Sequence, residues 1–183
     1  KQDLENYQPD LILHVMSPDQ VRAGKEDFET VKNLRDELGS LFPPVLYCLN
    51  KVDTHAAPNQ WPPEEHPEVA GKIKDNLDFV AKVIGEESKE PFESTQPLYG
   101  YEFDSPNNVG VVPTFLLQEP YWNVQTLSWM LGSYLPESAQ LQFFQAQQRE
   151  ELMRNFSRRT TNRFSGIAGG IGGAPTPIAD LPV

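Results

Sequence analysis

Two short apolar runs enclose an amphipathic segment near the N-terminus, and this order constrains the fold more than any other feature. The runs are DLILHVM (residues 10–16) and PPVLYCLN (residues 43–50). A nearly continuous apolar run is typical of a parallel strand that is buried on both faces. The segment between the runs, residues 25–38, has helical spacing. The sequence therefore predicts a right-handed strand–helix–strand unit, with loops at the carboxyl ends of the strands, where such sheets bind ligands.

Apolar residues at helical spacing predict three helices, over residues 25–38, 69–84 and 123–136. Their apolar positions are Phe28, Val31, Leu34 and Leu38; Val69, Ile73, Leu77, Val80 and Ile84; and Val124, Leu127, Met130 or Leu131, and Tyr134. Gly39 and Pro136 are suitable stops. Ser17 and Gln20 fit a helix start, although Gly24 favours a loop that continues to the next helix.

The later part of the chain predicts further strands and an appendage. Residues 97–117 contain two strand-like pieces around the turn-rich DSPNN, of which at least one is expected in the core and the pair is compatible with a hairpin. The chain is therefore expected to have three parts: a compact domain over 1–136, a polar helical arm over 137–164, and a Gly/Pro-rich segment over 165–183. The expected fold is α/β, an incomplete doubly wound, mostly parallel sheet with a C-terminal helical arm.

Composition limits the functional classes. The 183 residues carry a formal net charge of -11, which disfavours a nucleic-acid-binding surface over the whole domain. Apolar runs are shorter than the roughly 18 residues of a membrane span, and the N-terminal residues lack a signal-peptide pattern. Cys48 is the single cysteine, so an intrachain disulfide cannot form. These features favour a cytoplasmic protein.

The second predicted strand ends in Asn50-Lys51-Val52-Asp53, which has the chemistry of a guanine-reading loop. Asp53 can accept hydrogen bonds from the ring N–H and the exocyclic amine of guanine, whereas adenine has no matching donor pair. The amide of Asn50 can bridge the purine edge and the backbone, and the aliphatic stem of Lys51 can lie over the base. Val52 should point into the core. The alternative interpretation is a polar turn that closes a hydrophobic strand.

The order PDLILHVMSPDQ, amphipathic helix, PPVLYCLNKVD resembles the second half of a P-loop GTPase domain of the translation-factor-related class. The resemblance covers residues 10–53 best and is looser beyond about residue 90. It implies guanine contacts for Asn50, Lys51 and Asp53, and GTP or GDP as the ligand. It also implies a GTP hydrolase in a complete domain, where Mg²⁺ would accompany the nucleotide.

The sequence departs from that family in two respects. It contains no Gly-x-x-x-x-Gly-Lys-Ser/Thr loop to hold phosphates, because the Gly-Lys of Gly24-Lys25 is followed by Glu26. That loop and the switch segments would lie upstream of Lys1, so the chain is expected to lack catalytic residues. A Ser-Ala loop behind the guanine is also missing. Its candidate stretches, 98–100 and 114–116, do not match, and neither receives a role.

The arm resembles the junction, in some Era-like and immunity-related-like GTPases, that leads to a C-terminal hydrophobic domain. Its second half gathers the basic residues Arg149, Arg154, Arg158, Arg159 and Arg163. One interpretation is peripheral contact with an anionic membrane surface. The other is ordinary helix design, in which a basic arm docks on an acidic domain.

Two functional classes therefore remain, a guanine-nucleotide-binding switch and a non-catalytic, GTPase-derived module for interaction or membrane recruitment. An incomplete sheet would expose an edge, and a homodimer is one way to cover it. A metal site is not expected, because the spacing of His55, His66, Glu64 and Glu65 fits no ligand pattern. His14 is interpreted as a core or strand-end residue with a backbone partner, Cys48 as a core thiol, and Trp61 as the anchor of a proline-rich loop.

Overall fold

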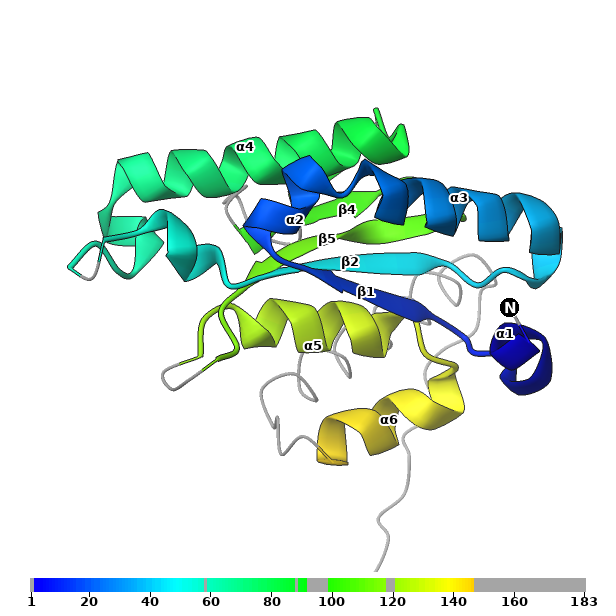
Figure 1. Ribbon diagram of the computed structural model, residues 1–183. Coiled ribbons are helices and arrows are strands. Elements are labelled where there is room, and N and C mark those ends of the chain that lie inside the picture. The colour runs from blue at the N-terminus through cyan, green and yellow to red at the C-terminus, as the bar shows by residue number, and fades with distance from the viewer. Residues whose placement is uncertain (1, 58, 88, 92–98, 118–120, 147–183) are drawn as a thin grey trace, which may run out of the picture. The chain divides into compact units, whose positions relative to one another are not determined.

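A five-stranded mixed sheet forms the centre of the protein, in the strand order β1-β2-β5-β4-β3 (Figure 1). The computed structural model describes residues 2–57, 59–87, 89–91, 99–117 and 121–146. Three neighbouring strands run parallel to one another: β1 (Ile12–Met16), β2 (Val45–Asn50) and β5 (Asn108–Thr114). The sheet continues antiparallel through β4 (Tyr101–Phe103) and β3 (Lys89–Pro91).

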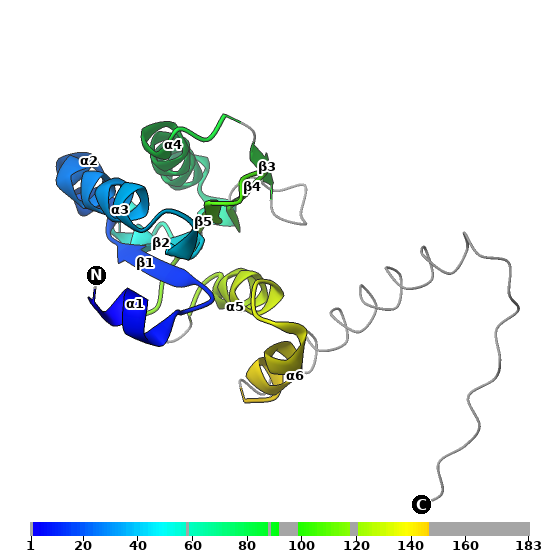
Figure 2. The ribbon, with the colours of Figure 1, turned by 90° about the vertical axis from the view of Figure 1, so that its right-hand side faces the viewer.

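Helices cover both faces of the parallel part of the sheet. Their bounds are α1 Gln2–Tyr7, α2 Pro18–Ala23, α3 Lys25–Leu38, α4 Pro67–Ile84, α5 Val124–Ser133 and α6 Glu137–Ala146, with short 3-10 helices η1 Gly39–Leu41, η2 Val52–His55 and η3 Pro63–Glu65. Helices α2, α3 and α4 lie on one face and α5 lies on the other (Figures 1 and 2). The chain divides into two compact units, residues 1–140 and 141–183, and the structure describes only residues 141–146 of the second.

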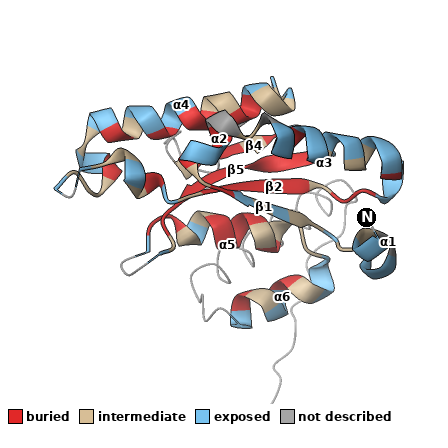
Figure 3. Cartoon of the chain, viewed as in Figure 1, coloured by how far each residue is buried: buried red, intermediate tan, exposed pale blue. Residues whose placement is uncertain are grey.

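The core lies on both sides of β2 and β5, as the burial colours show (Figure 3). Every residue of β2 before Asn50 is buried, and all seven residues of β5 are buried. Helix α4 contributes a fully buried stripe at the predicted spacing, comprising Val69, Ile73, Leu77 and Val80. A strand that is covered on both faces must be apolar along its whole length, which explains the unbroken apolar run of β2.

The strand–helix–strand unit is confirmed. Strands β1 and β2 pair in parallel, with a register that runs from Ile12 opposite Val45 to Met16 opposite Leu49. Helix α3 has the predicted bounds, and α4 includes the whole predicted apolar stripe. The two strand-like pieces around residues 104–108 are the antiparallel neighbours β4 and β5. The expected α/β class with a largely parallel sheet is thus present.

Two local expectations need correction. Residues 18–23 form α2 instead of a loop, because Gln20 Oε1 accepts the Ser17 N–H at 2.9 Å and closes the N-terminus of the helix. Gly24 separates two helices rather than prolonging a loop. The short elements α1 and β3 were not predicted, since neither is long enough to show a hydrophobic period. Of the predicted arm, residues 137–146 are helical, as α6.

Strand β1 forms one edge of the sheet, and within the described ranges only β2 pairs with it. The side chains of Leu13 and Val15 remain 39% and 55% exposed, whereas Met16 is buried. His14 lies on the helix-covered face, where its ring stacks on Phe28. The prediction that this run is buried on both faces is therefore wrong for β1, because in an edge strand of the described sheet the face with Leu13 and Val15 remains exposed. In the part of the chain that the structure describes, no helix combines the length and hydropathy needed to cross a membrane.

Candidate functional site

The candidate site lies where β2 and β5 end, at the carboxyl edge of the parallel strands. The chain leaves β2 toward the face that carries α4, and it leaves β5 toward the face that carries α5 (Figures 1 and 2). Adjacent connections that part in this way leave room for a ligand beyond the strand ends, as is general for open α/β sheets. Asn50 is the last residue of β2, so Asn50-Lys51-Val52-Asp53 occupies this position.

Asn50 links the two strand ends. Its Oδ1 accepts hydrogen bonds from the backbone N–H of Lys51 at 2.8 Å and of Leu116 at 3.1 Å, and from Thr114 Oγ1 at 3.4 Å. An amide oxygen with these donors is committed to the protein. The NH₂ group is therefore the part of Asn50 that can serve a ligand.

The residues after Asn50 turn sharply into η2. Lys51 adopts a left-handed conformation with φ of 64°, and its carbonyl accepts from Thr54 Oγ1 at 2.9 Å. Val52 is fully buried, as predicted, while Lys51 is exposed. The left-handed residue reverses the chain at once, so the side chains of Lys51 and Asp53 belong to one compact turn.

In this turn, one carboxylate oxygen of Asp53 has an unmet requirement for a hydrogen bond. The residue is half-buried, and its Oδ1 is buried without a hydrogen-bond partner among the residues that the structure describes. A buried polar oxygen without a partner carries a free-energy cost, which a ligand donor can remove. The other predicted residues of the loop have no such unmet requirement.

Residues 114–116, to which sequence analysis assigns no role, complete the site. Leu116 contributes through its backbone N–H, and Phe115 forms a two-way backbone bridge with Trp122 at 3.2 and 3.0 Å. A backbone N–H donor produces no pattern of side chains in the sequence, so sequence reasoning could not identify the Leu116 N–H. Only the pairing of β2 with β5 brings the segment to Asn50.

An aromatic cluster supports this segment. Trp61 meets Phe115 and Trp122 edge to face, with ring centroids 5.7 and 5.6 Å apart, and Tyr99 stacks on Trp122. Trp61 thus anchors its proline-rich loop, as predicted. We call Trp61, Tyr99, Phe115 and Trp122 the aromatic cluster.

Glu64 binds two members of the aromatic cluster, Tyr99 and Trp122. It accepts from Tyr99 Oη at 2.7 Å and from Trp122 Nε1 at 2.9 Å through the same oxygen, Oε1. Burial, together with the hydrogen bond to Glu64, raises the pKa of Tyr99 to about 12. The carboxylate is therefore engaged with neutral donors. Within the described ranges no three His, Cys, Asp or Glu side chains are grouped so as to hold a metal ion.

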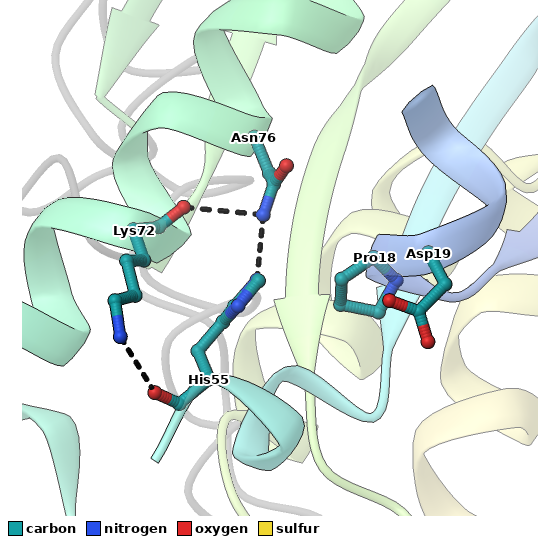
Figure 4. A pocket seen from close by; sticks show the side chains of 5 residues that line it. All are labelled: Pro18, Asp19, His55, Lys72 and Asn76. Atoms are coloured by element: carbon teal, nitrogen blue, oxygen red, sulfur yellow. Dashed lines mark hydrogen bonds between the residues drawn. The ribbon is translucent and has the colours of Figure 1, made fainter. Parts of the chain in front are cut away.

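A pocket of about 390 Å³ lies beside the site, lined by Pro18, Asp19, His55, Lys72 and Asn76 (Figure 4). His55 ends η2, so the pocket borders the loop that carries Asp53. His55 Nε2 lies 2.6 Å from Asn76 Nδ2, and the His55 carbonyl accepts from Lys72 Nζ at 3.3 Å. The pocket wall therefore includes contacts between η2 and α4.

His14 and Cys48 lie away from the candidate site. The partly buried His14 ring contacts the rings of Phe28 and Tyr47, and burial lowers its pKa although Asp27 acts in the opposite direction. Cys48 is a buried free thiol whose pKa is raised by burial. Both residues belong to neighbouring strands behind the site rather than to it.

Some predicted features fall outside the described residues. They are Leu98, residues 147–164 of the predicted arm, the predicted Gly/Pro-rich segment 165–183, and the basic cluster of Arg149, Arg154, Arg158, Arg159 and Arg163. Comparison of the chain with protein-family models, with curated proteins and with solved structures finds no match.

Proposed function

We propose that this protein binds guanine nucleotides and that Asn50, Lys51 and Asp53 recognise the base. The observation that carries the proposal is Asp53 Oδ1, which is buried without a hydrogen-bond partner within the described part of the chain, at the carboxyl edge of a parallel sheet. A site for guanine needs an acceptor of this kind, because guanine presents two adjacent N–H donors.

The chemistry of the base explains why Asp53 selects guanine. Its two carboxylate oxygens accept from the ring N–H and from the exocyclic amine, and both bonds are charge-assisted. Adenine has an unprotonated ring nitrogen at the corresponding position and would leave the carboxylate unpaired. A turn of the carboxylate about its Cβ–Cγ bond, which is a soft torsion, brings Oδ1 toward the ligand.

Asn50 and Lys51 make the other contacts with the base. The Asn50 oxygen is bonded to Leu116 and Lys51, so its NH₂ group donates to the acceptors of the purine edge. The exposed Lys51 covers the face of the base with its aliphatic stem while its ammonium group stays in water. The aromatic cluster supports the segment that orients Asn50.

The fold we propose is that of the second half of a P-loop GTPase domain. Supporting this are the parallel strands β1, β2 and β5, with α3 and α4 on one face and α5 on the other. The 183 residues contain no Gly-x-x-x-x-Gly-Lys-Ser/Thr loop, so these residues read the base without a conventional phosphate cradle. GTP hydrolysis is accordingly proposed only for a chain that also supplies that loop.

A competition titration tests guanine recognition. Fluorescently labelled GDP is titrated into the purified chain and then displaced by unlabelled GDP, GMP or ATP. We expect displacement by GDP and GMP and none by ATP, with binding lost in Asp53→Ala. Asp36→Ala is the matched control, because Asp36 is an exposed aspartate on α3. Equal displacement by ATP, or full binding by Asp53→Ala, would refute the proposal.

The open edge of β1 favours a second function, as an interaction module. Leu13 and Val15 are exposed on a strand that lacks the charges and prolines with which edge strands usually resist pairing. We propose that a second copy of the chain pairs here, extending the sheet across a two-fold axis. This proposal is independent of nucleotide binding and is tested by the oligomeric state.

A further inference from the structure

We propose that Asn76 of α4 is a positioning residue for the guanine-reading loop and that it acts through His55. The inference rests on the proposed function, since it assigns to Asp53 the recognition of the base. It adds a residue 23 positions further along the chain, on another element, to which sequence reasoning gave no role.

The contact geometry fixes how Asn76 and His55 interact. Asn76 Nδ2 donates to the Lys72 carbonyl at 3.1 Å and lies 2.6 Å from His55 Nε2 (Figure 4). A carbonyl can only accept, so the amide group at this position is the NH₂. His55 Nε2 must then be the acceptor of the second amide proton, and the ring proton resides on Nδ1.

We expect Asn76 to lower the folding stability of the protein. It is 1% exposed on the apolar side of α4, beside Ile73 and Leu77, and its Oδ1 has no hydrogen-bond partner in the described ranges. Asparagine is a weak helix former, and a buried acceptor without a donor costs folding free energy. An apolar side chain of similar size would avoid both costs. The bond to His55 is the compensating gain, and local sacrifices of stability are typical of functional positions.

The link reaches Asp53 through one short turn. Within η2, the Thr54 N–H donates to the Lys51 carbonyl at 3.2 Å, and the Ala56 N–H donates to the Asp53 carbonyl at 2.9 Å. Leu116 holds the Asn50 end of this loop, and Asn76 with Lys72 holds the His55 end. Asp53 lies between two fixed ends, so the backbone that carries its carboxylate is held in place before the ligand arrives.

The expected consequence of losing one fixed end is a population shift. If the ordered loop falls to about a tenth of the molecules, the apparent nucleotide affinity falls about tenfold. Asn76→Leu removes the donor and the unpaired oxygen together. We therefore expect an unchanged or higher melting temperature, faster amide exchange at Thr54 and Ala56, and about tenfold weaker GDP binding. A purely structural residue would instead lower stability and change exchange throughout α4.

The experiment measures these three quantities on the full chain, with Asn33→Leu on the exposed side of α3 as the control. A second pair of variants at the half-buried His55 guards against misfolding of the first. Gln at position 55 keeps an acceptor for Asn76 and Leu does not, so His55→Gln should retain slow exchange and His55→Leu should lose it. Native exchange at Thr54 and Ala56 in both Asn76→Leu and His55→Leu would overturn the proposal, as would equal loss in His55→Gln and His55→Leu.

Amide exchange is recorded without nucleotide, so it distinguishes the two proposals. If the native chain binds no guanine nucleotide, the proposed function fails, while the exchange data still decide whether Asn76 orders the loop.

Discussion

Asn50 Oδ1 accepts the backbone N–H of Leu116 at 3.1 Å, although 66 positions separate the two residues. The bond joins the ends of the neighbouring strands β2 and β5 and fixes the orientation of the Asn50 amide. It makes the candidate site a product of strand pairing as much as of the local motif.

Asn50→Ala should therefore lower stability as well as nucleotide binding. The change leaves the partly buried Leu116 N–H without its acceptor, and an unsatisfied buried donor costs about 1–3 kcal/mol. Urea denaturation at neutral pH measures the free energy of unfolding. Asn59→Ala, at an exposed loop position, is the control and should change it little. A loss no larger than that of the control would mean that the Asn50–Leu116 bond does not stabilise the fold.

Asp53→Asn should change base preference rather than abolish binding. An amide in place of the carboxylate offers one acceptor and one donor, which complements xanthine, where a carbonyl replaces the amine of guanine. We expect GDP binding to fall by about 10²-fold, since each mismatched polar contact costs about 1–3 kcal/mol. Xanthosine diphosphate should bind the variant better than it binds the native chain. The measurement is a competition titration with both nucleotides. An unchanged preference for GDP over xanthosine diphosphate would mean that Asp53 does not recognise the base.

Acid should destabilise the protein partly through His14. Burial lowers the pKa of His14 from 6.5, so the unfolded chain takes up a proton at this residue more readily than the folded chain does. The stability contribution of the neutral ring is complete above pH 6.5 and is lost as the pH falls through the lowered pKa. His14→Phe keeps an aromatic ring beside Phe28 and Tyr47 but cannot titrate. The difference in unfolding free energy between native and variant chains, measured from pH 7 to pH 4, should move in favour of the variant as the pH falls. A difference independent of pH would contradict the assignment.

Val15→Lys should suppress self-association. A charge on the exposed edge strand opposes pairing with a second copy, as it does at natural sheet edges. Sedimentation velocity over a range of concentrations should show a dimer for the native chain and a monomer for the variant. Leu41→Lys is the matched control, because Leu41 is exposed but lies in η1 rather than on the edge. A native chain that stays monomeric would exclude the homodimer.

The tests of nucleotide binding and of self-association separate the two proposed functions. A chain that dimerises through β1 without binding guanine nucleotides would act only as an interaction module. A chain that binds GDP with an Asp53-dependent preference would act as a guanine-nucleotide-binding protein, whatever its oligomeric state.

The local pattern was sufficient to predict α3, α4 and the pairing of β1 with β2. In these elements the period of the apolar residues matches the period of the backbone, so burial can be inferred without knowledge of the partners. The pattern failed at α2, where Gln20 Oε1 accepts the Ser17 N–H and a short helix forms before Gly24. It could not predict β3, because three residues are too few to show a period.

The sequence by itself determined the strand–helix–strand order, the helical spacing of α3 and α4, and the position of Asn50, Lys51 and Asp53 at the end of a buried strand. The tertiary structure alone decided that the Leu116 N–H fixes Asn50, that Glu64 binds Tyr99 and Trp122, and that Asn76 contacts His55. The physical reason is that periodicity records how a side chain faces the core, which is a local property. Hydrogen bonds between residues 21 to 66 positions apart depend on how strands and helices pack, and backbone donors such as the Leu116 N–H are the same in every residue except proline.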